Sequence, residues 1–169
     1  MTGRRQETTD QQQLIHTFYT AFQQRDYTGM IACYHSDIHF YDPVFRDLRG
    51  RQAQAMWHML CERGQDLQIS FDNVLADGHS GRADWQARYT FSTGRPVHNI
   101  IQATFHFQDG LIIRHQDQFD LWRWTRQALG PAGLLLGWTP MVQKRVRETA
   151  VASLHKFIAH HPEYQTTNS

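Results

Sequence analysis

The feature that most constrains the fold is a long run of period-two alternation between residues 67 and 119. Apolar and polar residues alternate through this run, and glycine-containing turns interrupt it at 77–81, 93–96 and 109–110. Alternation with period two is typical of strands with one buried face, and Asp-Gly pairs favour tight hairpin turns. The run therefore predicts long strands joined into an antiparallel meander, with one face against a core.

Residues 112–122, at the end of the meander, place ionisable side chains inside an otherwise apolar strand. In strand geometry, His115 and Asp117 share a face with Ile113 and Phe119. A polar group on a buried face needs a hydrogen-bond partner or a cavity that contains water. We predict that His115 and Asp117 face such a cavity and carry acid–base chemistry. A purely structural pair, or a face exposed to solvent, would also fit the pattern.

A shorter strand is predicted before the meander, over residues 37–41. Ile38 and Phe40 share one face, Asp42 falls in phase with them, and Pro43 ends the strand because proline cannot donate to the ladder. A carboxylate at this position either lies at the mouth of a cavity or caps the loop that follows. The sequence leaves both interpretations of Asp42 open.

Helical spacing predicts helices on both sides of these strands. A first helix follows Asp10 as N-cap, a second begins near Asp26, and a third covers 51–61. Another helical pattern follows Trp124, and Thr139-Pro140 is a favourable start for a last helix. The apolar residues of the first three helices are Leu14, Ile15, Phe18, Tyr19, Phe22, Met30, Ile31, Cys33, Tyr34, Ala53, Met56, Trp57 and Leu60. Helices followed by a meander predict an α+β fold.

Composition excludes some classes of function. The 169 residues carry a formal net charge of +1, which gives no electrostatic reason to expect nucleic acid as a partner. Cys33 and Cys61 are expected to be free thiols in a reducing compartment. No signal peptide is visible and no apolar run approaches the roughly 18 residues of a membrane span. We therefore expect a cytoplasmic protein.

Two segments carry a resemblance to a known family. Residues 26–43, with Gly50-Arg51, and residues 109–117 resemble the NTF2-like superfamily, especially its SnoaL-like and ketosteroid-isomerase-like branches. The resemblance covers roughly residues 11–122. It implies a cone-shaped, curved antiparallel sheet wrapped around N-terminal helices (cystatin-like, NTF2-like). The expected organisation is a disordered tail at 1–9, an NTF2-like domain at 10–124, a C-terminal helical extension at 125–162 and a tail at 163–169.

The resemblance also implies roles for individual residues. Asp42 matches the carboxylate that shuttles protons in ketosteroid isomerases, and Asp117 matches the carboxylate of the last strand in SnoaL-like cyclases. Phe18 and Ala103 fall where the isomerases carry their two oxyanion donors, so a steroid isomerase is not expected. Limonene-epoxide hydrolases, which share the fold, use an Asp-Arg-Asp set. Arg88 lies on the polar face of its strand and argues against that chemistry.

The leading prediction is a protein that binds a small hydrophobic molecule and acts as a cofactor-free acid–base enzyme of isomerase, cyclase or hydratase type. Asp42, Asp117 and His115 would be catalytic. The residues expected to contact substrate are Phe18, Tyr19, Tyr34, Phe40, Trp57, His58, Trp85, Tyr89, Ala103, Phe105 and Phe119. A homodimer is expected through the outward residues Gln102, Thr104 and His106 or through residues 134–138.

Two further functions remain open. The first is a non-catalytic ligand-binding or dimerisation module, which the missing oxyanion donors favour. The second is a metal enzyme, because His115 and Asp117 with His98 or His106 have the composition of a two-histidine, one-carboxylate site. Strand phase places His98 and His106 on the other face, so no metal and no cofactor is expected.

Overall fold

The computed structural model describes residues 2–165 of the chain. Its helices are α1 (Thr2–Gln23), α2 (Tyr27–Ala32), α3 (Arg51–Arg63), α4 (Leu121–Leu129), α5 (Pro131–Leu136), α6 (Pro140–Ala159) and the 3-10 helix η1 (Pro162–Tyr164). Its strands are β1 (Tyr34–Tyr41), β2 (Leu48–Arg49), β3 (Gln68–Ala76), β4 (Ser80–Thr90), β5 (Pro96–Gln108) and β6 (Leu111–Gln118). The α+β class predicted from the sequence is confirmed.

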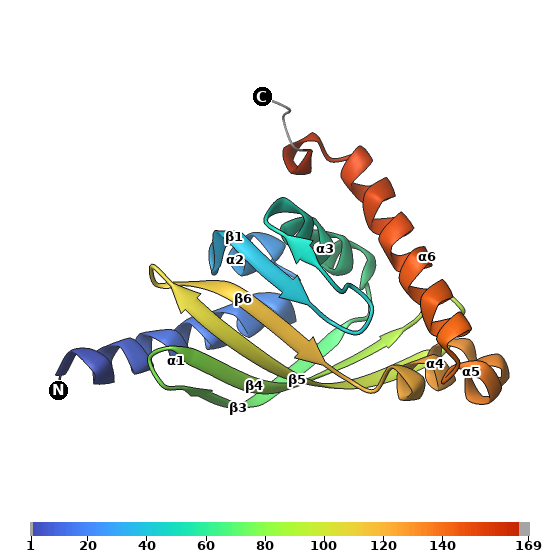
Figure 1. Ribbon diagram of the computed structural model, residues 1–169, viewed down its shortest axis with the longest axis horizontal. Coiled ribbons are helices and arrows are strands. Elements are labelled where there is room, and N and C mark those ends of the chain that lie inside the picture. The colour runs from blue at the N-terminus through green and yellow to red at the C-terminus, as the bar shows by residue number, and fades with distance from the viewer. Residues whose placement is uncertain (1, 166–169) are drawn as a thin grey trace.

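The six strands form one curved sheet in the order β2-β1-β6-β5-β4-β3 (Figure 1). Strands β3 to β6 make the predicted antiparallel meander. β1 is added to it by parallel pairing with β6, and β2 pairs antiparallel with β1. Because β1 lies beside β6, the first strand of the chain and the last strand of the meander together form the centre of the candidate site.

The core lies between the sheet and the helices α1 and α3. Phe18 of α1 and Trp57 of α3 are fully buried and contact Phe40 or His115 on the sheet. Burial of apolar surface, at about 25 cal/mol per Å², is the main term that holds these layers together. The aromatic residues that the sequence assigned to the inner face therefore do form the interior.

Three local differences separate the structure from the sequence predictions. α1 begins at Thr2 rather than after Asp10. Tyr34 opens β1 instead of ending a helix, because α2 stops at Ala32 and β6 is available as a pairing partner. An irregularity in the pairing of β5 with β6 buries Ile112 fully and leaves Ile113 half-buried. After it, the predicted phase of His115 and Asp117 is restored.

The C-terminal segment places α4 and α5 at one end of the sheet, and α6 runs from there past α3 (Figure 1). α4 is capped by Asp120 and attached to β5 through Gln127, whose amide side chain pairs with the backbone of His98 (2.8 and 3.2 Å). Thr139 caps α6, with Pro140 in the first turn, as predicted. Arg147 of α6 donates to the carbonyl of Pro43 (2.9 Å), so α6 contacts the loop after β1.

α6 packs unevenly. Its C-terminal half buries Leu154 and Phe157 against the domain, whereas Met141 near its start is largely exposed. Of the predicted tail at 163–169, residues 163 and 164 belong to η1 and residues 166–169 lie outside the described residues. Within the described residues, no helix is both long enough and apolar enough to cross a bilayer.

Candidate functional site

A chain of hydrogen bonds runs through the interior of the fold and centres on His115, which is 0% exposed. Nε1 of Trp57 donates to Oη of Tyr34 (2.7 Å), and that hydroxyl lies 2.7 Å from Nδ1 of His115. On the other side of the ring, Nε2 lies 3.0 Å from Oδ1 of Asp117. Nε1 of Trp85 donates to the same carboxylate oxygen (3.1 Å). Residues from β1, α3, β4 and β6 thus converge on one buried pair.

The tryptophan at the start of this chain fixes the direction of one hydrogen bond. An indole N–H only donates, so Oη of Tyr34 accepts from Trp57. With the tyrosine hydrogen directed at Nδ1 of His115 and the ring hydrogen on Nε2 directed at Asp117, every group in the chain has a partner.

Aromatic rings surround the His115 imidazole on all sides. Trp57 stacks on it with ring centroids 5.8 Å apart and an interplanar angle of 18°, and Phe105 lies at 4.5 Å. Phe18 and Phe40 approach edge-on at 5.4 and 5.2 Å. Ala103 lies opposite Asp117 in the pairing of β5 with β6. The structure therefore brings most of the sequence-predicted substrate residues together around His115 and Asp117.

Two polar atoms in this region lack partners among the described residues. Asp117 is 3% exposed, and its Oδ2 makes no hydrogen bond there, because both donors bind Oδ1. The hydroxyl of Tyr19 is also buried and unpaired within the described residues. Burial and the nearby Asp117 carboxylate raise the pKa of Tyr19 well above its ordinary value. These atoms are the ones with capacity left for a ligand or a water molecule.

Asp42 lies at the end of β1 and caps the loop that follows, which is one of the two interpretations that the sequence left open. Its Oδ1 accepts from the backbone N–H groups of Val44 (2.6 Å) and Phe45, so it caps the loop. Phe40 pairs with His115 in the parallel ladder, so Asp42 follows on the face that carries Asp117. The pKa of Asp42 is raised to about 7, mainly by burial; the nearby Asp117 also raises it, and the two backbone hydrogen bonds partly oppose the rise.

Tyr89, at the same end of the cone, is joined to the C-terminal extension. Its hydroxyl accepts from Nε1 of Trp124 (2.7 Å). Burial raises the pKa of Tyr89, and the charge of Asp42 adds to that rise. Phe119 is half-buried beside the core. Tyr89, Phe119 and Asp42 therefore mark the edge of the buried region.

His58 is not part of this interior. Its ring stacks on Tyr27 with centroids 3.6 Å apart, and its Nδ1 lies 3.1 Å from the hydroxyl of Tyr164. Successive helix residues point about 100° apart, so Trp57 takes the face toward His115 and His58 faces η1. The assignment of His58 to the substrate site is not supported by this placement.

Among residues 2–165, neither Arg88 nor the two histidines proposed as metal ligands lies beside His115 and Asp117. Arg88 is exposed, as its strand phase predicted, and gives no interior arginine for an Asp-Arg-Asp set. His98 lies on the outer face and hydrogen-bonds Gln86 (2.7 Å), and His106 is exposed. Both of these histidines are therefore kept apart from His115 and Asp117 by the sheet itself.

Sequence reasoning missed the donors that complete the chain. The sequence pattern presents Trp57 and Trp85 as apolar lining, yet each indole N–H holds a member of the chain. It gives Trp124 no role at the site, although Trp124 holds Tyr89. A usable signal exists, since a buried tryptophan nearly always needs an acceptor for its N–H.

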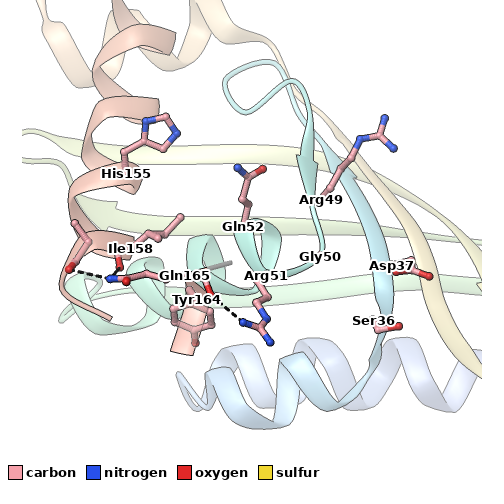
Figure 2. Close-up of a pocket in the computed structure, with 11 residues that line it drawn as sticks. Ser36, Asp37, Arg49, Gly50, Arg51, Gln52, His155, Ile158, Tyr164 and Gln165 are labelled. Atoms are coloured by element: carbon pink, nitrogen blue, oxygen red, sulfur yellow. Dashed lines mark hydrogen bonds between the residues drawn. The ribbon is translucent and has the colours of Figure 1, made fainter. Parts of the chain in front are cut away.

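A groove of about 860 Å³ lies elsewhere, between β1, the start of α3 and the end of α6 (Figure 2). Arg51, one of its lining residues, donates to the carbonyl of Gln165 (2.9 Å). The groove is also lined by Ser36, Asp37, Arg49, Gly50, Gln52, His155, Ile158, Ala159 and Tyr164. None of the sequence-predicted site residues lines this groove.

Comparison with solved structures shows the same architecture in several proteins. An LEH-like epoxide hydrolase from M. tuberculosis is 21% identical, covering 79% of this chain and 98% of that one, with a TM-score of 0.60. An NTF2-like protein of unknown function from Burkholderia pseudomallei is 18% identical over 70% and 97%, with a TM-score of 0.62. A protein of Xanthomonas campestris provisionally named a polyketide cyclase is 19% identical over 72% and 98%, with a TM-score of 0.61.

The family match includes most of the residues that form the buried hydrogen-bond network. No curated protein matches the sequence. The family model described as the SnoaL-like domain matches residues 15–115, which is more than half of the chain and ends before α4. With the curved sheet, its covering helices and the structural neighbours in agreement, the chain belongs to the SnoaL-like domain family.

Proposed function

We propose that this protein binds a small hydrophobic molecule and transfers protons on it without a cofactor, with Asp42 and Asp117 as the acid–base pair. The observation that carries the proposal is the buried chain ending at Asp117, which engages Oδ1 fully and leaves Oδ2 without a described partner. Aromatic surroundings favour an apolar substrate. Two carboxyl groups at the end of such an interior are suited to take a proton from one atom and return it to another.

The two carboxyl groups have different tasks in this mechanism. Asp42, with its pKa raised to about 7, is protonated in a large fraction of molecules at neutral pH and serves as the acid. Oδ2 of Asp117 serves as the base, since His115 and Trp85 occupy Oδ1. His115 acts as a positioning residue, because its own ring nitrogens are both engaged. Two carboxyl groups in different environments, one of them kept protonated, are typical of acid–base sites.

The choice among the chemistries of related proteins rests on the missing arginine. One structural neighbour is an epoxide hydrolase and another is provisionally named a polyketide cyclase. Arg88 points outward in this chain, so an Asp-Arg-Asp arrangement around a water molecule is not supported. A cyclisation or isomerisation of a carbonyl compound, which needs only proton transfer, fits the residues better.

Turnover of a panel of lipophilic ketones and polyketide-like aromatics tests the proposal. Asp117→Asn and Asp42→Asn are each expected to lower kcat at least about 100-fold, the usual contribution of a positioned acid or base. Their Tm is expected to remain unchanged or to rise, because asparagine keeps the acceptor oxygen. Asp37→Asn, an exposed position on β1, is the matched control. Full activity in both site variants would rule out the mechanism.

A second candidate is a dimerisation module, which one surface feature favours. Five large apolar residues are exposed close together in sequence around α5 and the start of α6: Leu134, Leu135, Leu136, Trp138 and Met141. A contiguous apolar surface of this kind is typical of a protein interface. Light scattering would then give a mass of two chains for the native protein and of one chain for Leu135→Glu. A native monomer at high micromolar concentration would exclude this function.

A further inference from the structure

Three side chains with metal-binding atoms meet where α3 contacts the end of α6. They are His58 and Glu62, one turn apart on α3, and His161, just after α6. One ligand atom from each lies within 4.8 Å of the other two. Oε2 of Glu62 lies 3.8 Å from Nε2 of His58 and 4.0 Å from Nε2 of His161. No residue of this cluster takes part in the proposed acid–base chemistry.

The Nδ1 nitrogens of both rings have hydrogen-bond partners outside the cluster. Nδ1 of His161 lies 2.8 Å from the carbonyl of Phe157, which only accepts, so this nitrogen carries the hydrogen. Nδ1 of His58 lies 3.1 Å from the hydroxyl of Tyr164, which can accept the same kind of bond. With the ring hydrogen on Nδ1, Nε2 of each histidine offers a lone pair toward Glu62. Second-sphere bonds of this kind orient metal-binding histidines in general.

The cluster has more acceptors than donors. Two imidazole lone pairs and a carboxylate face one another, and Glu163 contributes further negative charge near His58. A shared proton or a cation is needed to join three such atoms.

We propose that His58, Glu62 and His161 bind one divalent transition-metal ion, with zinc as the best match. Two imidazoles and one carboxylate are common zinc ligands, and water completes a four-coordinate shell. Ligand atoms around tetrahedral zinc lie about 3.4 Å apart, given metal–ligand distances of about 2.0–2.2 Å. The two Glu62 distances therefore need to shorten by about 0.4 and 0.6 Å, and the Glu62 side chain is 56% exposed and free to adjust. The two histidine nitrogens, which lie within 4.8 Å of each other, also need to approach.

The proposed ion would join the C-terminal helix to the SnoaL-like domain. Among the polar bonds that make this connection, Arg63 donates to Ser153 (2.6 Å) and Arg51 to the carbonyl of Gln165 (2.9 Å), both at exposed positions. α6 in turn contacts the loop of Asp42 through Arg147 and Pro43. A metal at the far end of α6 would hold the helix, and with it the cover over that loop, against the domain.

Metal-free full-length protein, prepared by chelation and desalting, is titrated with zinc chloride. One ion per chain is expected by calorimetry and by elemental analysis. Tm is expected to rise by about 5 °C or more at a zinc concentration 100 times Kd. Cobalt in place of zinc should give visible absorption bands typical of nitrogen and oxygen ligands. Magnesium and calcium, which prefer oxygen ligands only, should leave Tm unchanged.

His161→Ala and Glu62→Gln are the test variants; Glu62 is 56% exposed and His161 is 24% exposed. His161→Ala should abolish the Tm rise and the cobalt bands, and Glu62→Gln should weaken binding at least about tenfold. His160→Ala is the matched control, since His160 makes the same kind of bond to a helix carbonyl, at Lys156 (2.7 Å), but lies outside the cluster. An equal Tm rise in His161→Ala and native protein, or no zinc uptake by native protein, would overturn the proposal.

Discussion

The molecule contains two arrangements of histidine with carboxylate, and they differ in how completely they are hydrogen-bonded. In the interior, His115 and Asp117 are almost fully buried, and both ring nitrogens of His115 have partners at 3.0 Å or less. At the α3–α6 junction, Glu62 is more than half exposed and faces two ring nitrogens at 3.8 and 4.0 Å.

The difference shows how burial determines what such a pair can do. In a dry interior every unpaired donor is costly, so the His115 chain is complete among the described residues except at Oδ2 of Asp117. At the surface, water satisfies polar groups at little cost, and an incomplete cluster persists. The interior arrangement is therefore rigid, and the junction arrangement can adapt to an added ion.

The strongest test of this comparison is to truncate one carboxylate from each arrangement. Asp117→Ala leaves the N–H groups of His115 and Trp85 without an acceptor and opens a small cavity, so it should lower the free energy of unfolding by about 4 kcal/mol. Glu62→Ala in metal-free protein should change it by less than about 0.5 kcal/mol. Urea unfolding measures both. Equal losses would show that the two arrangements do not differ in the way described.

Removing one hydroxyl from each arrangement gives a smaller contrast. Tyr34→Phe deletes the oxygen that links Trp57 to His115 and leaves two buried groups unpaired, for an expected loss of about 2 kcal/mol. Tyr164→Phe deletes a single bond to His58 near the surface and should cost less than about 1 kcal/mol. Thermal or urea unfolding of the two variants measures both losses of stability. A larger loss for Tyr164→Phe would reverse the comparison.

The pKa of Asp42, which lies between the dry interior and the surface, makes the stability of the protein depend on pH. Its folded-state pKa of about 7 lies above the ordinary value of 3.8, so the folded protein binds an extra proton between these two pH values. The resulting stabilisation is complete below pH 3.8 and is lost as the pH rises toward 7. Discounted for its partial exposure, native protein should lose on the order of 1–2 kcal/mol relative to Asp42→Asn between about pH 5 and pH 8. If the free energy of unfolding of the two proteins depended on pH in the same way, the Asp42 carboxyl would be solvated and its pKa would not be raised.

Much of the sheet was predictable, because its signals are local. Alternation and turn residues predict the inward face of His115 and Asp117, and the structure confirms this face together with the cap at Thr139. The phase error at Ile112 and Ile113 arose from an irregularity between β5 and β6, which no residue pattern announces. The helical prediction for Tyr34 is wrong because its position in a strand depends on β6, far along the chain.

The sequence identifies the carboxylates and the histidine of the candidate site, but it does not reveal the hydrogen bonds that join them to other residues. Asp42, His115 and Asp117 stand out as polar residues in apolar phase. The bonds from Trp57 and Trp85 depend on how α3 and β4 pack, which spacing does not reveal. The cluster of His58, Glu62 and His161 joins residues about a hundred positions apart and carries no periodic signal.

The parallel pairing of β1 with β6 also has a consequence for biosynthesis. Phe40 is matched with His115, about 75 residues later, so β1 cannot join the sheet until the ribosome has released nearly the whole meander. Loop closure over such a span is slow compared with hairpin formation. Until then the apolar side chains of Ile38 and Phe40, which are fully buried in the folded protein, have no cover from the sheet.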